Sequence, residues 1–146
     1  MINVRFRSSY ILVALVSACL VSCGGGRSKE ESKEIESEVN NLNAIQAAYI
    51  AHTEKTRRLP QQPEDLTKFF PKDLDATKIF TSTRDGQKYV IGWGTDHRKV
   101  SGDKPLVIGY EKKGKNGVRM VWTGFGVMEM SDEEFSKADF ANGIKP

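Results

Sequence analysis

Three side chains of the kind used in nucleophilic catalysis occur in the segment GTDHRKVSGD, residues 94–103. Asp96 directly precedes His97, and Ser101 follows, so a carboxylate, an imidazole and a hydroxyl are all present. Adjacent residues of an extended chain point to opposite sides, which places Asp96 and His97 poorly for action as a pair. We therefore expect His97 to be an exposed loop residue, and we expect the protein not to be an enzyme.

The same segment could supply oxygen ligands to a calcium ion through Asp96 and Asp103. Calcium prefers about six to eight closely spaced oxygen ligands, whereas here basic residues separate the two aspartates. The two histidines of the chain have no HExxH or similar zinc-binding spacing. We expect no metal ion and no other cofactor, and calcium at Asp96 and Asp103 is the alternative.

Two further groups of charged residues could take part in chemistry. Asp132, Glu133 and Glu134 could form an acid–base cluster, but they follow Ser131 in a capping-box pattern. The dipole at a helix start already stabilises negative charge there. The three lysines in residues 112–115 could touch phosphate, but a solvated hairpin end is the simpler interpretation. No phosphate-binding glycine loop is present, and we expect no small-molecule substrate.

Two aromatic residues are candidates for contact with a partner. Phe125 lies between Gly124 and Gly126 at an expected turn, where an exposed aromatic side chain could anchor a protein interface. Folding of Phe125 back over the sheet edge is the alternative. Trp93 alternates with Ile91 and is expected in the core. An exposed Trp93 on the sheet face would instead indicate contact with glycans.

The chain begins with a segment typical of export. Arg5 and Arg7 precede an almost wholly apolar run, residues 10–22, and this run is short of the roughly 20 residues that span a membrane. A positively charged start before a short apolar stretch is typical of a secretory signal. The run leads into LVSC, which resembles the bacterial lipobox and ends at Cys23.

The lipobox resemblance implies cleavage before Cys23, which removes residues 1–22 as a signal peptide. It also implies a lipid on Cys23 that anchors the mature protein to a membrane, facing the periplasm or the exterior. An ordinary signal peptide that happens to contain cysteine is the alternative. Residues 23–31 begin with three glycines after the cysteine and are expected to form a flexible tether. The glycine at position 24 slightly favours the outer membrane.

Cleavage at this site also changes the composition of the protein. The chain has 146 residues with 22 basic and 19 acidic side chains, and the signal contains two arginines but no acidic residue. The mature chain is then nearly neutral, which argues against a nucleic-acid partner. One cysteine leaves with the signal and the other carries the lipid, so we expect neither a disulfide nor a thiolate metal site.

The residues after the tether, 32–146, are expected to form one domain. Good helix formers are abundant in residues 28–58, where Leu42 and Tyr49 belong to an apolar stripe at helical spacing. This pattern predicts one long helix that ends before Pro60. We expect the stripe to pack on a sheet of the same chain, and a coiled-coil seam is the alternative.

A short helix is expected from Pro63 to about Phe70. Asn116-Gly117 predicts a hairpin turn, and the capping box at Ser131 predicts a short C-terminal helix. The segments around these signals alternate as strands do. Their alternating residues are Tyr89, Ile91 and Trp93, then Leu106, Ile108 and Tyr110, then Met120 and Trp122, and then residues 127–130.

These elements predict an α+β fold: a long N-terminal helix packed on a roughly four-stranded antiparallel meander, with short helices after the first helix and at the C-terminus. The order resembles the soluble domains of type II secretion pseudopilins and type IV pilin-like proteins. The segments that carry the resemblance are AIQAAYIAHTEKTRRLPQQPEDLTKFF, TSTRDGQKYVIGWG and GFGVMEMSDEEF, within residues 40–135. The resemblance implies a pilin-like fold and a protein partner in the cell envelope.

The chain departs from that family at its start. Pseudopilins carry a prepilin cleavage site before a long apolar helix, whereas here a lipobox precedes the polar segment RSKEESKEIESE, residues 27–38. Filament assembly by the usual route is therefore not expected. We predict a lipid-anchored envelope binding protein that is an accessory of a secretion or pilus system. An envelope lipoprotein that inhibits or contacts cell-wall enzymes or glycans, unrelated to secretion, is the alternative.

Overall fold

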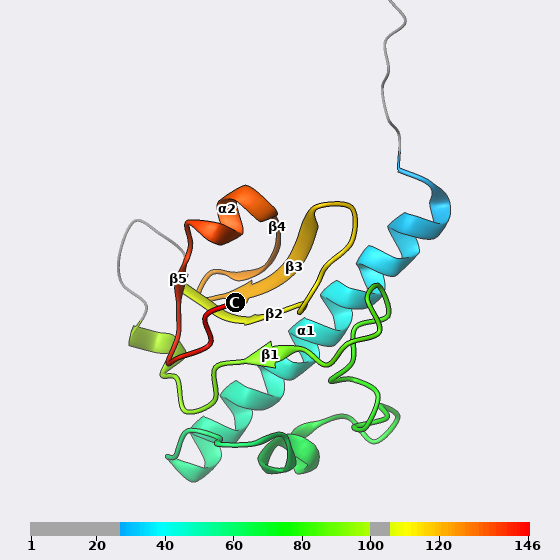
Figure 1. Cartoon of the computed structure of the whole chain (residues 1–146). Helices are drawn as coiled ribbons and strands as arrows, with labels where there is room; N and C mark the ends of the chain where they lie inside the picture. Colours follow the sequence, from blue (N-terminus) through cyan, green and yellow to red (C-terminus); the bar gives the residue numbers. More distant parts are fainter. Residues whose placement is uncertain (1–26, 100–105) are drawn as a thin grey trace, which may run out of the picture.

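The computed structural model describes residues 27–99 and 106–146. These residues form an α+β fold in which a long helix, α1, packs on an antiparallel sheet with the strand order β1-β2-β3-β4 (Figure 1). A further short strand, β5, pairs in parallel with β2. The predicted long helix, antiparallel sheet and short helices are confirmed. The elements are α1 Lys29–Thr56, η1 Pro63–Phe69, β1 Val90–Ile91, η2 His97–Lys99, β2 Leu106–Tyr110, β3 Val118–Thr123, β4 Gly126–Ser131, α2 Asp132–Ser136 and β5 Asp139–Phe140.

Local signals set the two ends of α1. The Ser28 hydroxyl accepts a hydrogen bond from the backbone N–H of Glu31 at 3.1 Å and so caps the first turn. At the other end Arg57 has a φ of 59°, and its N–H donates to the Thr53 carbonyl. Residues 23–31 are expected to form a flexible tether, but the Ser28 cap starts the helix at Lys29, inside this segment.

The apolar stripe of α1 faces the sheet of the same chain. Leu42, Ile45 and Tyr49 are fully buried, and they pack with Met120 and Trp122 of β3 in the main core. Burying side chains of this size stabilises the fold by about 1.5–3 kcal/mol each. The stripe is thus a core face, as predicted, and the first turns of α1 extend past the sheet (Figure 1).

The short helix after α1 is a 3₁₀-helix, η1, and it packs against α1. Pro63 occupies its first turn, as the sequence predicts, and Gln62 before it supplies no side-chain cap. Leu66 is fully buried and fixes η1 to the core. Runs of 3₁₀ geometry longer than about four residues are uncommon, so tertiary packing rather than local preference maintains this element.

The first strand is much shorter than its alternating pattern suggests. Ile91 is buried on the α1 side, as predicted, but β1 contains only Val90 and Ile91. The Gly92 N–H donates to the Ile108 carbonyl of β2, whereas the Trp93 N–H turns back to the Ile91 carbonyl. This tight turn ends the strand, and Trp93 after it is only partly buried, although it still packs against the main core.

Strand β2 has an irregularity that places one side chain on the face of the sheet opposite to the predicted one. The register of its pairing with β3 shifts between Val107 and Gly109, as happens where a β-bulge inserts an extra residue. Ile108 remains in the core next to α1, but Tyr110 packs in the smaller core on the opposite face. The prediction that Tyr110 shares a face with Ile108 is wrong for this reason.

Two predicted turns connect the remaining strands. Asn116 and Gly117 both have a positive φ, 55° and 74°, as a two-residue hairpin turn of type I′ requires. They join β2 to β3. Gly124 and Phe125 form the turn between β3 and β4, with Thr123 paired to the residue after the turn. The meander from β2 to β4 therefore follows the sequence prediction.

The C-terminal residues cover the face of the sheet away from α1. The predicted capping box starts α2: the Ser131 hydroxyl accepts from the Glu134 N–H, and the Glu134 carboxylate accepts from the Ser131 N–H. Phe135 of α2 packs on Tyr110 with the ring centroids 4.9 Å apart. The Tyr110 hydroxyl donates to the Ile144 carbonyl at 3.0 Å. Strand β5, which the pattern did not predict, pairs with β2 and so belongs to the sheet itself.

Candidate functional site

A cluster of buried polar residues joins α1 to the loop before β1. Glu38 of α1 is fully buried, and its carboxylate accepts from the N–H and the hydroxyl of Thr83 at 2.6 and 2.5 Å. The Tyr89 hydroxyl donates to the other carboxylate oxygen. Burial, followed by the neighbouring Glu38 carboxylate, raises the pKa of Tyr89 well above its ordinary value. The phenol is therefore a stable donor at neutral pH.

A buried ion pair lies in the same region. Arg84 Nη1 is 3.0 Å from Glu111 Oε2, and both side chains are almost completely buried. Glu111 also accepts from the Ser82 hydroxyl at 2.8 Å and from the Met120 N–H at 2.7 Å. Burial raises the pKa of Glu111 despite these donors. These contacts hold the loop at residues 82–89 against β2 and β3.

The sequence pattern marks the position of Glu38 but does not reveal its partners. Glu38 follows Ile35 by three residues and precedes Leu42 by four, so it lies on the apolar stripe of α1. A carboxylate buried on such a stripe must be hydrogen-bonded to remain there. Because neither Glu38 nor Glu111 is accessible to a solute, we assign this cluster to stability and not to chemistry.

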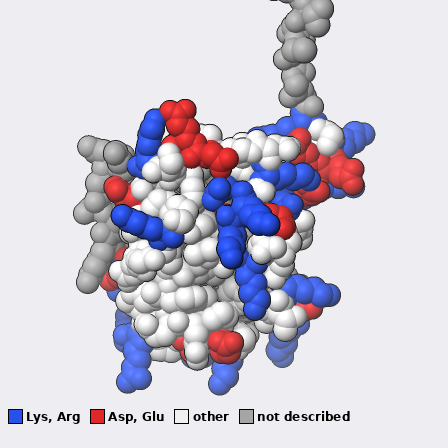
Figure 2. Space-filling model, viewed as in Figure 1, with Lys and Arg blue, Asp and Glu red and all other residues white. Residues whose placement is uncertain are grey.

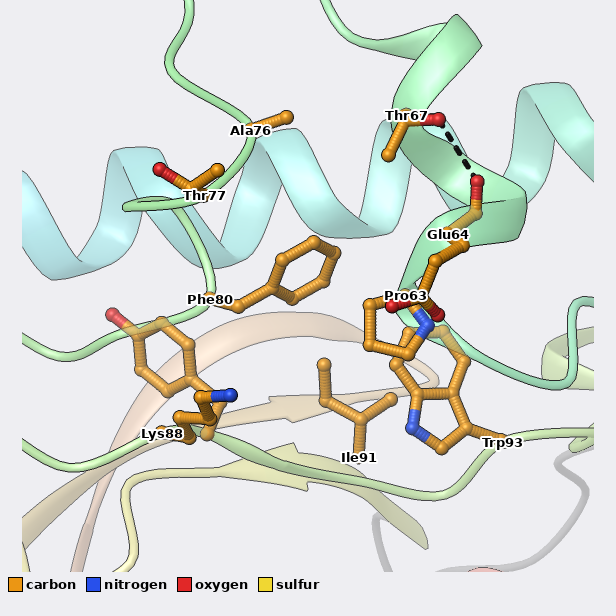
Figure 3. Close-up of a pocket in the computed structure, with 10 residues that line it drawn as sticks. Pro63, Glu64, Thr67, Ala76, Thr77, Phe80, Lys88, Ile91 and Trp93 are labelled. Atoms are coloured by element: carbon orange, nitrogen blue, oxygen red, sulfur yellow. Dashed lines mark hydrogen bonds between the residues drawn. The ribbon is translucent and has the colours of Figure 1, made fainter.

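A groove opens between η1, the loop at residues 76–80 and β1 (Figure 3). Its volume is about 440 Å³, which lies in the range of sites for small ligands. Phe80, Ile91 and Trp93 contribute apolar walls, and Pro63 of η1 closes one side. Among these residues only Trp93 is recognisable from the sequence as a contact candidate, because the groove forms from segments distant along the chain.

Aromatic contacts fix the position of Trp93. Its ring stacks on Tyr49 with the centroids 6.3 Å apart and an interplanar angle of 19°. Phe80 lies on another side, with the ring centroids 6.2 Å apart. Trp93 is therefore partly buried beside the core, and it contributes to the lining of the groove instead of forming an open platform on the sheet.

Two charged side chains flank the apolar walls of the groove. Lys88 and Glu64 are both exposed, and they lie toward opposite ends of the groove (Figure 3). Neither forms an ion pair with another described residue. The lining therefore suits a ligand with an apolar face and polar groups at its edges.

The segment with catalytic residue types makes structural contacts. Asp96 accepts from Arg98 Nε at 2.9 Å, and His97 packs edge-on against Tyr49 with the ring centroids 6.1 Å apart. His97 is partly buried, so the expectation of an exposed loop histidine is wrong because the ring packs on Tyr49. Burial lowers the pKa of His97 below its ordinary value, which favours the neutral imidazole.

The acidic residues at the start of α2 are also engaged in local contacts. Asp132 and Glu133 form ion pairs with basic residues of β3 and of the helix end, at 3.0 and 2.6 Å. Hydrogen bonds from the capping serine lower the pKa of Glu134. Among the hairpin lysines, Lys115 pairs with Glu34 of α1 at 2.5 Å. These charges serve helix capping and attachment of the hairpin to α1.

The turn between β3 and β4 presents exposed apolar side chains. Phe125 is 70% exposed and Met128 of β4 is 41% exposed. Such exposure does not fit the alternative in which Phe125 folds over the sheet edge. Figure 2 shows one face of the molecule, where small groups of acidic and basic side chains lie around a broad uncharged area. The groove and the β3–β4 turn are thus two regions suited to contact with a partner.

Several sequence candidates lie outside the described residues, namely Cys23, Ser101 and Asp103. Within the part of the chain that the structure describes, no group of three or more His, Cys, Asp or Glu side chains is arranged to hold a metal ion. The described helices include none that is both long and apolar enough to span a membrane. Comparison with protein-family models, curated proteins and solved structures gives no match to this chain.

Proposed function

We propose that this protein is a lipid-anchored, non-enzymatic binding protein of the bacterial cell envelope, with a pilin-like head, and that it is an accessory of a secretion or pilus system. The observation that carries the proposal is the position of α1. Its capped start follows Cys23 by a few residues, and its first turns extend past the sheet (Figure 1). A lipid at Cys23 would then hold the head away from the membrane surface.

The start of α1 supports a role as a water-exposed spacer. Lys29, Glu30 and Ser32 are exposed, and this polar surface is unsuited to a bilayer or to the core of a filament. The helix has 28 residues, which at 1.5 Å per residue gives a length of about 42 Å. Its packing on the core begins at Ile35, and Glu38 is already fully buried, so only the turns before Ile35 supply the reach.

The pilin-like part of the proposal rests on the order of the elements. A long helix packs on an antiparallel meander, and a short helix follows it, as the resemblance to pseudopilins implies. The lipobox in place of an apolar helix argues for an accessory and against a filament subunit. The exposed Phe125 at the β3–β4 turn is a candidate anchor for the protein partner.

Crosslinking in intact cells would test this function. The full-length protein with a C-terminal tag would be expressed at native level, and captured proteins would be identified by mass spectrometry. We expect components of a secretion or pilus system, lost in a Cys23→Ala strain and reduced in a Phe125→Ser strain. Capture of cell-wall enzymes instead would contradict the accessory role.

The lipid anchor has its own test. Cells grown with an alkyne-bearing fatty acid should label the wild-type protein, and the Cys23→Ala protein should carry no label. Cys19→Ala is the matched control, because Cys19 lies in the proposed signal and should be dispensable for labelling. Equal labelling of the wild-type and Cys23→Ala proteins would contradict the anchor without bearing on the partner.

The groove favours a second candidate function, contact with cell-wall glycans. Its aromatic walls and the flanking Lys88 and Glu64 match a ring with an apolar face and polar edges. Soluble cell-wall glycan fragments should change the fluorescence of Trp93, and Trp93→Phe should lose the response. Trp122 is fully buried and serves as an internal control. An unchanged spectrum at saturating fragment concentration would exclude this function.

A further inference from the structure

Strand β4 is an edge of the sheet, and its register with β3 determines where its backbone groups point. The pairing is uninterrupted from Thr123 with Gly126 to Val118 with Ser131. Because Thr123 and Gly126 close a two-residue turn, they exchange both backbone hydrogen bonds. Along an antiparallel strand such pairs alternate with pairs that make no hydrogen bonds to each other. The residues after Gly126 therefore turn their backbone alternately away from β3 and toward it.

This alternation leaves two residues of β4 with outward N–H and C=O groups. They are Val127 and Glu129, and no other described residue forms a backbone hydrogen bond with these outward groups. The next outward residue, Ser131, is satisfied because its N–H donates to the Glu134 carboxylate at 2.9 Å. The described structure thus contains an open strand edge that is two hydrogen-bonding residues long.

The open edge has few of the features that protect edge strands. Proteins usually block such edges with proline, lysine, a bulge or an inward-pointing charge. Residues 126–131 contain no proline or lysine, and the pairing has no bulge. The strand has one charge, Glu129, on the side of the sheet that faces α1, and Arg27 forms an ion pair with it. The charge is thereby compensated within the chain.

We propose that β4 is a homodimerisation edge, in which two copies of this chain pair their β4 strands antiparallel about a two-fold axis at Met128. In this register Val127 of each copy exchanges backbone hydrogen bonds with Glu129 of the second copy, so every outward group is used. A two-fold axis at Glu129 would place like charges directly opposite, which is destabilising. An axis at Val127 would bring Glu129 opposite Phe125 in the turn, where no strand continues.

The exposed apolar side chain on β4 fits this arrangement. Met128 is 41% exposed and lies on the face away from α1, since it is paired with Val121 of the smaller core. At the two-fold axis the two Met128 residues form a pair without hydrogen bonds, whose Cα atoms are about 4.5 Å apart. The pairing would cover both methionines and join two sheets into one.

A disulfide experiment can test the register. Each cysteine would be introduced into the full-length chain with Cys19→Ser and Cys23→Ser, so that it is the sole thiol, and the purified protein would be oxidised mildly in detergent. Met128→Cys should form a disulfide dimer, because the Cα spacing suits the bond. Phe125→Cys should form no disulfide dimer, because each Phe125 lies three residues from the two-fold axis, and the resulting six-residue separation places the two thiols roughly 20 Å apart.

Phe125 is nonetheless more exposed to solvent than Met128. Random collisions would crosslink Phe125→Cys at least as well, and that result would overturn the proposal. A Met128→Cys protein that forms no disulfide dimer although its circular dichroism is native would also overturn the proposal.

A proline substitution provides the second measurement. Val127→Pro removes an outward N–H and leaves the bonds to β3 intact, so it should halve the mass in sedimentation while the circular dichroism is retained. Met128→Pro removes an inward N–H and should instead lower the stability of the fold. A Val127→Pro protein that remains dimeric would overturn the proposal, whatever the disulfide result.

Discussion

The guanidinium of Arg84 and the carboxylate of Glu111 form a buried ion pair, with Nη1 and Oε2 3.0 Å apart. The other guanidinium nitrogen, Nη2, lies 3.4 Å from the carbonyl oxygens of Lys115 and Val118. Arg84 therefore ties the loop before β1 both to the end of β2 and to the hairpin that follows. The pair closes the end of the sheet nearest the start of α1, where Glu34 also binds Lys115.

Removing one member of this pair should destabilise the protein strongly. Arg84→Met leaves the Glu111 carboxylate buried without its cation, which typically costs about 3–5 kcal/mol. Adding Glu111→Gln to this variant should recover much of the lost stability. The amide oxygen can still accept from the Met120 N–H, and the buried charge is gone. Denaturant unfolding of the wild-type protein, the two single variants and the double variant gives the coupling free energy between Arg84 and Glu111. Additive losses would contradict a direct interaction between the two residues.

The parts of the fold that the sequence predicted depend on local signals. Ser28 and Ser131 cap their helices through hydrogen bonds to residues three positions ahead. Asn116 and Gly117 adopt the positive φ that their residue types favour. Each of these features requires only a few neighbouring residues, so it can be read without knowledge of the rest of the molecule.

The parts that were missed depend on contacts between distant segments. The bulge in β2 arises in the pairing of β2 with β3, and it turns the side chain of Tyr110 to the face opposite to the predicted one. Strand β5 forms only because its backbone pairs with the edge of β2. The partners of Glu38 are 45 and 51 residues away in the chain. The groove likewise combines η1 with β1 and the loop before it. Hydrophobic alternation and secondary-structure propensity do not predict these contacts, since both describe only residues that are neighbours in the sequence.

The tyrosines should resist ionisation at the pH where a free phenol titrates. Burial raises the pKa of Tyr49 to about 12, and burial also raises the pKa of Tyr89 and of Tyr110. The fourth tyrosine, Tyr10, lies in the proposed signal. A chain that has lost residues 1–22 should therefore show little phenolate absorbance at pH values near 10.

The same shifts predict how stability changes in alkali. A folded pKa above the unfolded value contributes stability that is complete below about pH 10 and is lost as the pH rises through the folded pKa. For Tyr49 this loss falls between about pH 10 and about 12. Titration of the unfolded chain in denaturant is the control, and it should give the ordinary tyrosine pKa. A native spectrum that titrates near pH 10 would contradict the burial of these phenols.

His97 should make the protein less stable in mild acid. Burial lowers its pKa in the folded state, so below about pH 6.5 the unfolded chain binds a proton that the folded chain resists. The stability from the neutral imidazole is present above that pH and declines as the pH falls through the lower folded pKa. Unfolding free energies at several pH values should show this slope, and His97→Gln should reduce it. An unchanged slope in that variant would assign the effect to other groups.

Gly114 should be far less tolerant of alanine than Gly86, although both have a positive φ, 70° and 67°. A Cβ on Gly114 would lie 2.5 Å from the Val118 carbonyl oxygen and 2.6 Å from Arg119 Cγ, whereas one on Gly86 meets nothing within 4 Å. The carbonyl cannot move easily, because it accepts from the Lys115 N–H at 2.9 Å across the hairpin.

Both alanine substitutions should incur the cost of a left-handed conformation, about 1–2 kcal/mol. Gly114→Ala should lose about 1–3 kcal/mol more, since overpacking adds to the strain. Denaturant unfolding of the two variants gives the free energy that each loses. The backbone cost is common to both, so the difference between the two losses is the cost of the steric clash at Gly114. Equal losses would mean that the hairpin relaxes around the added methyl group, and the tight closure of β2 on β3 at Gly114 would then be contradicted.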